Sequence, residues 1–262
     1  MTNWLTCAFL ISCLPFLGGQ INAVPFTHAH NDYLHENPLQ DALEHGFISV
    51  EADILMGNGE LYVGHDRIDL RNKPLMNFQA TYLEPLYQRF RSMNGSLYPG
   101  YGGKFYLWID IKYQGGDVFM ILKEMIQPYR EMLYSANENE RGKVMILISG
   151  DRPVDMLLAD SSGYFHIDGR PADLQKNISS TSMPFISEHF NKICRLNAND
   201  SLDKEELGKL NNFVSQCRMQ QKKVRLWATP ENEILWSQLL QAKVDLINTD
   251  SLSKLSRFIL KQ

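Results

Sequence analysis

Two stretches decide the fold of this chain: VPFTHAHND at residues 24–32 and FISVEAD at residues 47–53. Each is a short run of apolar and β-branched residues that ends in polar residues, which is typical of a β-strand. Between them, residues 38–45 have the apolar spacing of a short helix. A strand, a helix and a second strand in succession predict a βαβ unit with parallel strands.

The same alternation repeats along the rest of the chain. It predicts eight strands, at residues 24–30, 47–53, 104–110, 144–149, 164–168, 184–187, 224–228 and 244–248, with helices at 38–45, 117–134, 202–216, 231–241 and 251–260. Eight βα units in roughly 240 residues have the size of an α/β fold of the (β/α)₈ or TIM barrel type. A doubly wound open sheet is the alternative, and the lack of a glycine-rich nucleotide-binding turn after the first strand weakens it. Residues 67–103 are too long for a simple connection and are interpreted as an insertion with one helix near 83–91.

The composition excludes several classes of protein. Hydrophobic residues make up 44% of the 262 residues and charged residues 21%, which is typical of a folded globular protein and not of a disordered chain or a coiled coil. The 30 acidic and 26 basic residues give a formal net charge of -4. Because nucleic-acid-binding proteins carry a concentrated positive charge, we expect no nucleic-acid partner.

The beginning of the chain has the character of a signal peptide. An apolar run at residues 4–19 is followed by a short polar stretch and the small residue Ala23. We therefore predict a signal peptide at residues 1–23 and an exported protein with one barrel domain at residues 24–262. A lipid anchor on Cys13, within Leu10-Ile11-Ser12-Cys13, is the alternative. No other stretch has the roughly 20 apolar residues of a membrane helix, so we expect no transmembrane segment in the mature chain.

Two cysteines remain after removal of the predicted signal peptide, Cys194 and Cys217. In an oxidising compartment they could form a disulfide, and two buried free thiols are the alternative. Neither interpretation supplies a nucleophile or a metal site.

Reactive side chains are concentrated where the predicted strands end, which is where a barrel of this type places its chemistry. Residues two apart on a strand point to the same side, so His28 with His30, Glu51 with Asp53, and Asp110 with Lys112 can all face the barrel axis. Buried carboxylates at this density repel one another unless a cation lies among them. Lys112 is the one evident cation in the sequence nearby.

A hard divalent cation fits this set of carboxylates. Oxygen ligands without a cysteine or several histidines favour Mg²⁺ or Ca²⁺ over zinc. The predicted ligands are Glu51, Asp53 and Asp110, with the amide oxygen of Asn31 as a fourth candidate. A network of salt bridges that closes the barrel is the structural alternative.

A second histidine follows the second strand. Asn58-Gly59 indicates a tight turn, and the run after it brings His65 back towards the same mouth. His30 and His65 could then serve as general base and general acid. Lys112 is predicted to bind an anionic substrate, and Trp227 to lie against it or to fill the core. Asp168 either contacts substrate or pairs with Arg170.

These residues together resemble a known superfamily. The order His30-Asn31, Glu51-x-Asp53, His65-Asp66 and Asp110-x-Lys112 is similar to that of the phosphatidylinositol-phospholipase-C-like phosphodiesterases, which include the glycerophosphodiester phosphodiesterases. The string from His28 to Tyr33 most resembles a branch related to a yeast mitochondrial-inheritance protein. Glycerophosphodiesterases carry arginine where this chain has Asn31. The eukaryotic phosphoinositide phospholipases have asparagine there, as this chain does, and in them the asparagine binds the metal. The resemblance implies a barrel and metal-assisted cleavage of a phosphodiester by a phosphoric diester hydrolase or lyase.

The leading hypothesis is therefore an exported phosphodiesterase with Mg²⁺ or Ca²⁺ that acts on a small-molecule or lipid-headgroup phosphodiester, with a role in lipid metabolism. A metal-dependent hydrolase of the amidohydrolase type is a second hypothesis, with His28, His30, His166 or His189 and Asp250 as ligands for a zinc-like metal. A binding protein that keeps the pocket without turnover is the third. The identity of the metal separates the first two, and a turnover assay separates the third.

Overall fold

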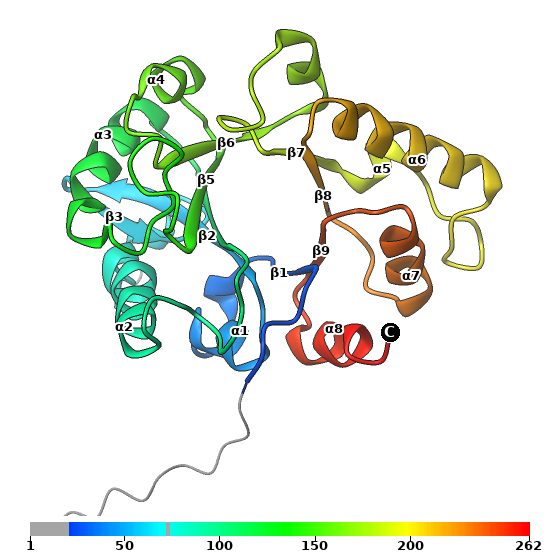
Figure 1. Ribbon diagram of the computed structural model, residues 1–262, viewed down its shortest axis with the longest axis horizontal. Helices are drawn as coiled ribbons and strands as arrows, with labels where there is room; N and C mark the ends of the chain where they lie inside the picture. Colours follow the sequence, from blue (N-terminus) through cyan, green and yellow to red (C-terminus); the bar gives the residue numbers. More distant parts are fainter. Residues whose placement is uncertain (1–20, 72–73) are drawn as a thin grey trace, which may run out of the picture.

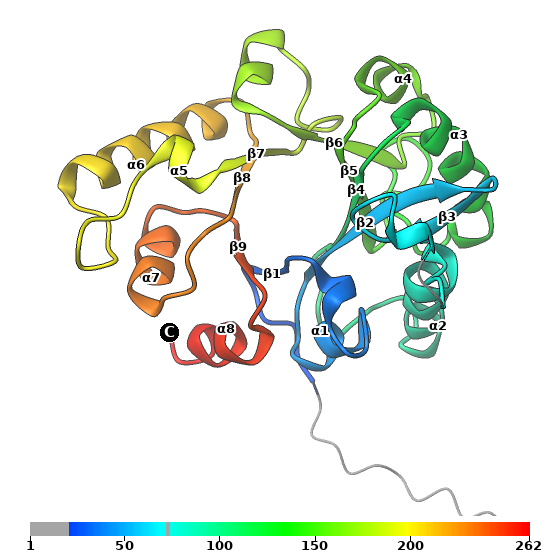
Figure 2. The ribbon, with the colours of Figure 1, turned by 180° about the vertical axis from the view of Figure 1, so that it is seen from behind.

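In the computed structural model, which describes residues 21–71 and 74–262, parallel strands close into a barrel with helices outside it (Figures 1 and 2). The barrel strands are β1 (Thr27–Ala29), β2 (Ser49–Gly57), β4 (Phe105–Ile111), β5 (Val144–Gly150), β6 (Phe165–Gly169), β7 (Phe185–His189), β8 (Lys223–Trp227) and β9 (Leu246–Thr249). They pair in this order, and β9 pairs with β1 to complete the circle. The predicted (β/α)₈ barrel is confirmed.

The helices connect successive strands and cover the outside of the barrel (Figure 1). They are α1 (Gln40–Glu44), α2 (Glu84–Ser92), α3 (Gly115–Met125), α4 (Val154–Ala159), α5 (Phe190–Ile193), α6 (Lys204–Met219), α7 (Glu233–Gln241) and α8 (Leu252–Ile259). The insertion between β3 and β4 holds α2, which continues from a π-helical turn at Gln79–Leu83. The helix predicted there is confirmed.

Two predicted elements are shorter in the structure. The first strand begins at Thr27 and not at residue 24, because Phe26 has a φ of 64° and turns the backbone out of the extended conformation. The helix predicted over residues 117–134 ends at Met125, and a 3₁₀ turn follows at Gln127–Tyr129. Pro128 explains this end, because it disfavours the α conformation at the residue before it and has no N–H to donate.

The predicted hairpin after the second strand is confirmed. Strand β3 (Glu60–Val63) pairs antiparallel with β2, and Gly57 lies opposite Glu60. The two residues between them, Asn58 and Gly59, have φ values of 52° and 80°, as a tight two-residue turn with two positive φ angles requires. The hairpin extends away from the barrel (Figure 2). The chain after β3 returns to the site, because His65 and Asp66 line the same cavity as Glu51 and Asp110.

Aromatic side chains fill the inside of the barrel below its mouth. The ring of Phe185 lies edge-on to those of Tyr106 and Trp108, with centroid distances of 5.2 and 5.1 Å. This apolar layer lies beneath the carboxyl ends of the strands, where the site lies.

Several predictions concern the first part of the chain. Residues 1–20 of the predicted signal peptide, with Cys13 of the alternative, lie outside the described residues. Ile21 and Ala23 are partly buried against the core. In the described ranges no helix is both long and apolar enough to cross a membrane.

The two cysteines of the barrel domain are free thiols. Cys194 and Cys217 are both buried, and burial raises the pKa of each thiol to about 12. Of the two interpretations of this pair, the structure has the free thiols. Neither thiol forms the thiolate needed for a nucleophile near neutral pH.

Candidate active site

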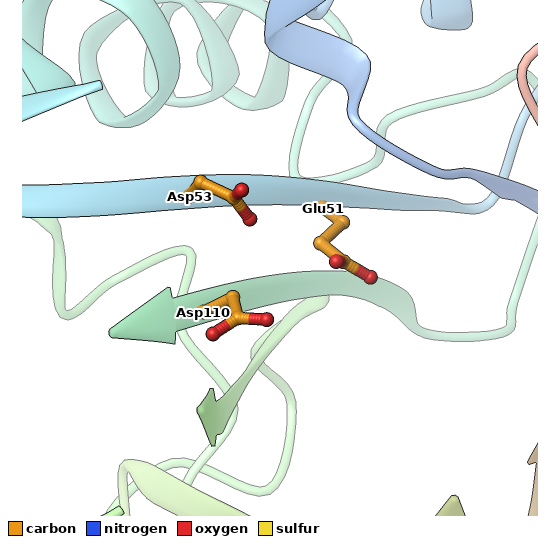
Figure 3. A group of neighbouring side chains, drawn as sticks. All are labelled: Glu51, Asp53 and Asp110. Atoms are coloured by element: carbon orange, nitrogen blue, oxygen red, sulfur yellow. The ribbon is translucent and has the colours of Figure 1, made fainter. Parts of the chain in front are cut away.

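Three carboxylates meet at the carboxyl ends of β2 and β4. Glu51 and Asp53 lie two residues apart on β2 and so share a side of the strand, and Asp53 is opposite Asp110 of β4 in the parallel register. One oxygen from each of the three lies within 4.8 Å of the others. Figure 3 shows Glu51 and Asp53 extending from β2 in the direction of β4, where Asp110 lies. The register of β2 and β4 thus creates the carboxylate cluster that the sequence predicts.

The electrostatics of the carboxylate cluster fit a bound cation. Burial and then the charge of Glu51 raise the pKa of Asp110 to about 6, and the same two effects raise the pKa of Asp53. Lys112 partly offsets this repulsion, with its Nζ 2.7 Å from Asp53 Oδ2 and 3.4 Å from Asp110 Oδ2. The other oxygen of Asp53, Oδ1, is buried and has no hydrogen-bond partner within the described residues. A carboxylate oxygen in this state is a ready ligand for a hard cation.

Glu51 has partners that the sequence does not indicate. Its Oε2 accepts from Nη2 of Arg225 on β8 and lies 3.1 Å from Nε2 of His28. Arg225 is also held by Asn248, and its guanidinium lies over the Trp108 ring, 4.5 Å from the centroid. The expectation that Lys112 is the only nearby cation is therefore wrong. Although burial opposes ionisation, Arg225 and the His28 hydrogen bond hold the pKa of Glu51 far below its usual range.

His28 is a neutral, buried member of this network. Its Nδ1 lies 2.7 Å from the hydroxyl of Ser49 and its Nε2 bonds Glu51. Burial, followed by the charge of Arg225, lowers its pKa to about 3. Because both ring nitrogens are engaged within the protein, His28 orients Glu51 and is not available for proton transfer to a substrate.

His30 lies on the wall of the open cavity. Its Nδ1 is 2.9 Å from Oδ1 of Asp250, which follows β9, and 3.0 Å from Nδ2 of Asn31. Burial lowers its pKa, but the Asp250 hydrogen bond and the charge of Glu51 outweigh burial, so that the net pKa is raised. With Nδ1 turned to Asp250, the Nε2 of His30 is the nitrogen that can exchange a proton with a ligand.

Asn31 takes an unusual backbone conformation next to His30. Its φ of 47° is in the left-handed region, where asparagine is tolerated better than most residues. It lines the cavity together with Glu51 and Asp110. The Asn31 side chain therefore lies between His30 and the carboxylate cluster's side of the cavity, and Asn31 stays the candidate fourth ligand.

His65 reaches the same cavity from the hairpin. The backbone N–H groups of His65 and Asp66 both donate to Oδ2 of Asp69, at 2.9 Å each. The His65 side chain is 59% exposed, and its Nδ1 lies 3.3 Å from Asp66 Oδ2. The structure thus places the second predicted histidine at the exposed rim of the cavity and not at its buried base.

The cavity at the mouth of the barrel has a volume of about 560 Å³ and collects nearly all the predicted site residues. The predicted site residues that line it are His30, Asn31, Glu51, His65, Asp110, Lys112 and Trp227. Asp53 does not line the cavity but forms an ion pair with Lys112, which does. The Trp227 ring is edge-on to His189 at 4.5 Å, so it is fixed at the cavity wall. A volume of this size suits a small molecule or a headgroup.

Two cationic residues of the cavity were absent from the predicted site. Arg225 and Arg170 both line it. Arg225 lies two residues before Trp227 on the same strand, so the rule of alternating faces could have identified it. Arg170 follows β6 and bonds Asp168, 2.5 Å from Nη1 to Oδ2, so the second interpretation of Asp168 is the one observed. No local pattern distinguishes Arg170 from a surface arginine.

The histidines required by the amidohydrolase hypothesis do not converge on a metal. His28 is engaged by Ser49 and Glu51, and Nδ1 of His166 bonds the carbonyl of Thr181. Over residues 21–71 and 74–262, the side chains grouped to hold a metal are the three carboxylates, without a histidine. This geometry favours a hard cation over zinc.

Comparisons with known proteins identify the family of this chain. A family model described as AIM6-like phosphodiesterase domain matches residues 18–166, and a model of the glycerophosphoryl diester phosphodiesterase family matches residues 223–252. The chain is 27% identical to an altered inheritance of mitochondria protein 6 homolog from Arthroderma benhamiae, over 86% of this chain and 81% of that protein. It is 25% identical to altered inheritance of mitochondria protein 6 from Eremothecium gossypii, over 88% of this chain and 68% of that protein.

Solved structures show the same fold. A glycerophosphodiester phosphodiesterase from Parabacteroides distasonis aligns with a TM-score of 0.55 at 14% identity, over 92% of this chain and 98% of that one. One from Agrobacterium tumefaciens aligns with a TM-score of 0.52 at 12% identity, over 89% and 98%. At such identities the likeness is one of architecture, and it supports the barrel fold.

Proposed function

Because the chain belongs to the family of AIM6-like phosphodiesterase domains, we propose that it is an exported enzyme that cleaves phosphodiesters with Mg²⁺ or Ca²⁺. The observation that carries this proposal is the placement of the carboxylate cluster, His30 and Lys112 at one cavity of about 560 Å³. A phosphodiester bound there would meet a cationic side chain, a histidine able to take a proton, and the oxygen ligands of a hard cation.

His30 is the proposed general base. Asp250 accepts from Nδ1 of His30, which leaves Nε2 unprotonated and directed to the ligand. Nε2 takes the proton of a substrate hydroxyl near the phosphorus, the hydroxyl oxygen bonds phosphorus, and the bond from phosphorus to the leaving oxygen breaks. A cyclic phosphate ester and a free alcohol result.

His65 is the proposed general acid. It must donate a proton to the leaving oxygen, and its place on the rim of the cavity suits a group that meets the departing alcohol. Its 59% side-chain exposure gives it freedom to approach the substrate.

Glu51, Asp53 and Asp110, with Asn31, would hold the divalent cation. When bound, the cation polarises a phosphoryl oxygen and offsets the charge that develops there. Lys112 binds the phosphate charge beside this position, held in place by Asp53 and Asp110. Export is proposed from the apolar run at residues 4–19 and Ala23.

Turnover of a panel of glycerophosphodiesters and phosphoinositides tests the proposal. Purified mature protein is incubated with Mg²⁺, with Ca²⁺ or with a chelator, and products are identified by phosphorus NMR. We expect cleavage that stops on chelation and returns with one of the two ions. Asp53→Asn should abolish it, whereas Asp41→Asn, a half-buried residue of α1 that does not line the cavity, should not. Full activity in the chelator, or no cleavage of any diester, would contradict the proposal.

A further inference from the structure

Glu231 lies one step behind the pair of His30 and Asp250, in the loop that follows β8. Strands β8 and β9 are parallel neighbours, so this loop and the turn after β9 lie side by side at the carboxyl end of the barrel (Figure 1). Glu231 and His30 both line a second cavity, of about 370 Å³, whereas Glu231 does not line the cavity assigned to the substrate. This position suits a residue that acts through other residues of the chain and not through contact with the substrate.

One carboxylate oxygen of Glu231 holds the turn after β9. Its Oε1 accepts from the N–H groups of Asp250 and Ser251, at 2.6 and 3.2 Å, and from the hydroxyl of Thr249 at 2.7 Å. The Thr249 hydroxyl oxygen also accepts from the Ser251 N–H, at 2.9 Å. Hydrogen bonds to a carboxylate are stronger than those between neutral groups. Three donors from consecutive residues on one carboxylate oxygen therefore fix the backbone on both sides of Asp250.

The same turn contacts His30 at two points. The carbonyl of Thr249 accepts from the backbone N–H of His30 at 3.1 Å, and Oδ1 of Asp250 lies 2.9 Å from Nδ1 of the His30 ring. The first contact fixes the backbone of His30 relative to the turn, and the second fixes the ring. A displacement of the turn would disturb both contacts and would move Nε2, the nitrogen that is directed to the ligand.

The carboxylate of Asp250 depends on a fixed backbone because its side chain is 66% exposed. Within the described residues, the side chain that it bonds is that of His30. An exposed pair of this kind gains little from charge attraction and loses side-chain freedom when it forms. A turn that already holds Asp250 beside the ring lowers this loss, because less of the geometry remains to be ordered.

We propose that Glu231 is a positioning residue for His30: it fixes the turn at Thr249–Ser251 and, through Asp250, keeps the proton of the ring on Nδ1 and leaves Nε2 free to accept a proton. This inference rests on the proposed function only in taking His30 as the general base. The tautomer of the ring is a property of the free protein and is measured without turnover.

NMR of protein with isotope-labelled histidine reports which ring nitrogen carries the proton. The spectra are recorded without substrate or divalent ion at alkaline pH, where the ring is neutral, and His30→Ala identifies the signals of His30. We expect the proton on Nδ1 in the wild type and a mixture of the two tautomers in Glu231→Ala. Glu231→Gln should keep the wild-type tautomer, because its amide oxygen can accept from the same donors.

Asn232→Ala is the matched control for a purely structural effect in the same loop. Asn232 caps α7, with its Oδ1 accepting from the Leu235 N–H at 2.7 Å, so its loss should lower the melting temperature. Its side-chain hydrogen bonds join Leu235 and the carbonyl of Asp200 and not the turn after β9. The tautomer of His30 should therefore stay as in the wild type.

Turnover of the diesters gives a second measurement. Glu231→Ala should lower kcat by about 10- to 100-fold, the usual effect of removing an outer partner of a site residue. KM should change little, because Glu231 does not line the substrate cavity. In an Asp250→Ala background Glu231→Ala should cause little further loss, because the residue through which it acts is already gone.

The results separate this inference from the proposed function. An unchanged tautomer in Glu231→Ala, the same change of tautomer in Asn232→Ala, or an equal loss of kcat with and without Asp250 would overturn the positioning role. A change of tautomer confined to Glu231→Ala, in a protein whose wild type cleaves none of the diesters, would overturn the phosphodiesterase activity and leave the positioning role standing.

Discussion

Replacement of Arg225 by methionine should destabilise the metal-free protein strongly. Arg225 is 3% exposed and Glu51 is 4% exposed, and they form an ion pair inside the barrel. Methionine keeps most of the volume of the arginine stem over Trp108 but leaves the Glu51 carboxylate without its cation. In the wild type, burial and then the charge of Arg225 lower the pKa of His28 to about 3. Loss of Arg225 should raise this pKa, but burial, the larger cause, remains, so His28 replaces the lost cation only in part.

The magnitude follows from the burial of the pair. Removal of one partner of a buried ion pair costs about 3 to 5 kcal/mol. For a domain of this size each kcal/mol lowers the melting temperature by about 2 to 4 °C, so we expect a decrease of about 6 to 20 °C. A divalent cation bound to Glu51 supplies the missing charge. At a concentration a hundred times its Kd, the cation adds about 2.7 kcal/mol to the free energy of unfolding. The melting temperature of the variant should therefore rise more on addition of the cation than that of the wild type does.

The assay is thermal denaturation followed by circular dichroism, in a chelator and in Mg²⁺ or Ca²⁺. Arg218→Met is the matched control, since Arg218 pairs with Asp245 at 2.8 Å but is 40% exposed. A pair in this position contributes at most about 1 kcal/mol, with no dependence on a divalent ion. If Arg225→Met and Arg218→Met have the same melting temperature in the chelator, the buried Glu51 carboxylate does not need Arg225 for its stability. If the variant gains nothing extra from either ion, Glu51 is not a ligand.

Three further predictions concern catalysis and export. His30→Ala and His65→Ala should each lower turnover by about 10² to 10⁴-fold while metal affinity by calorimetry stays nearly unchanged, and wild-type turnover of His65→Ala would remove His65 from the mechanism. The pKa of His30 is raised by Asp250, and a base works only when unprotonated, so Asp250→Asn should move the acidic limb of the kcat/KM profile to lower pH; a limb that stays in place would show that Asp250 does not tune His30. Exported protein should begin near Val24 by N-terminal sequencing, and an intact start in the cytoplasm or a lipid on Cys13 would refute the predicted cleavage.

The sequence by itself determined the strands of the barrel and most of the carboxylate cluster. Side chains alternate along a strand with a period of two, so Glu51 and Asp53 must share a face wherever the strand lies. The polar ends of successive apolar runs then place the site at the carboxyl side of a barrel. These are local rules, and the structure confirms them in β2 and β4.

Other features depended on residues that are distant in sequence. Closure of the barrel brings Arg225 to Glu51 across 174 residues and Asp250 to His30 across 220. Only this closure shows that Glu51 is already paired, that His30 has an orienting carboxylate, and that Arg170 faces it across the mouth. The physical reason is that alternation fixes which side of a strand a residue occupies, whereas the partner on the opposite wall is fixed by long-range strand pairing, which leaves no periodic signal in the sequence.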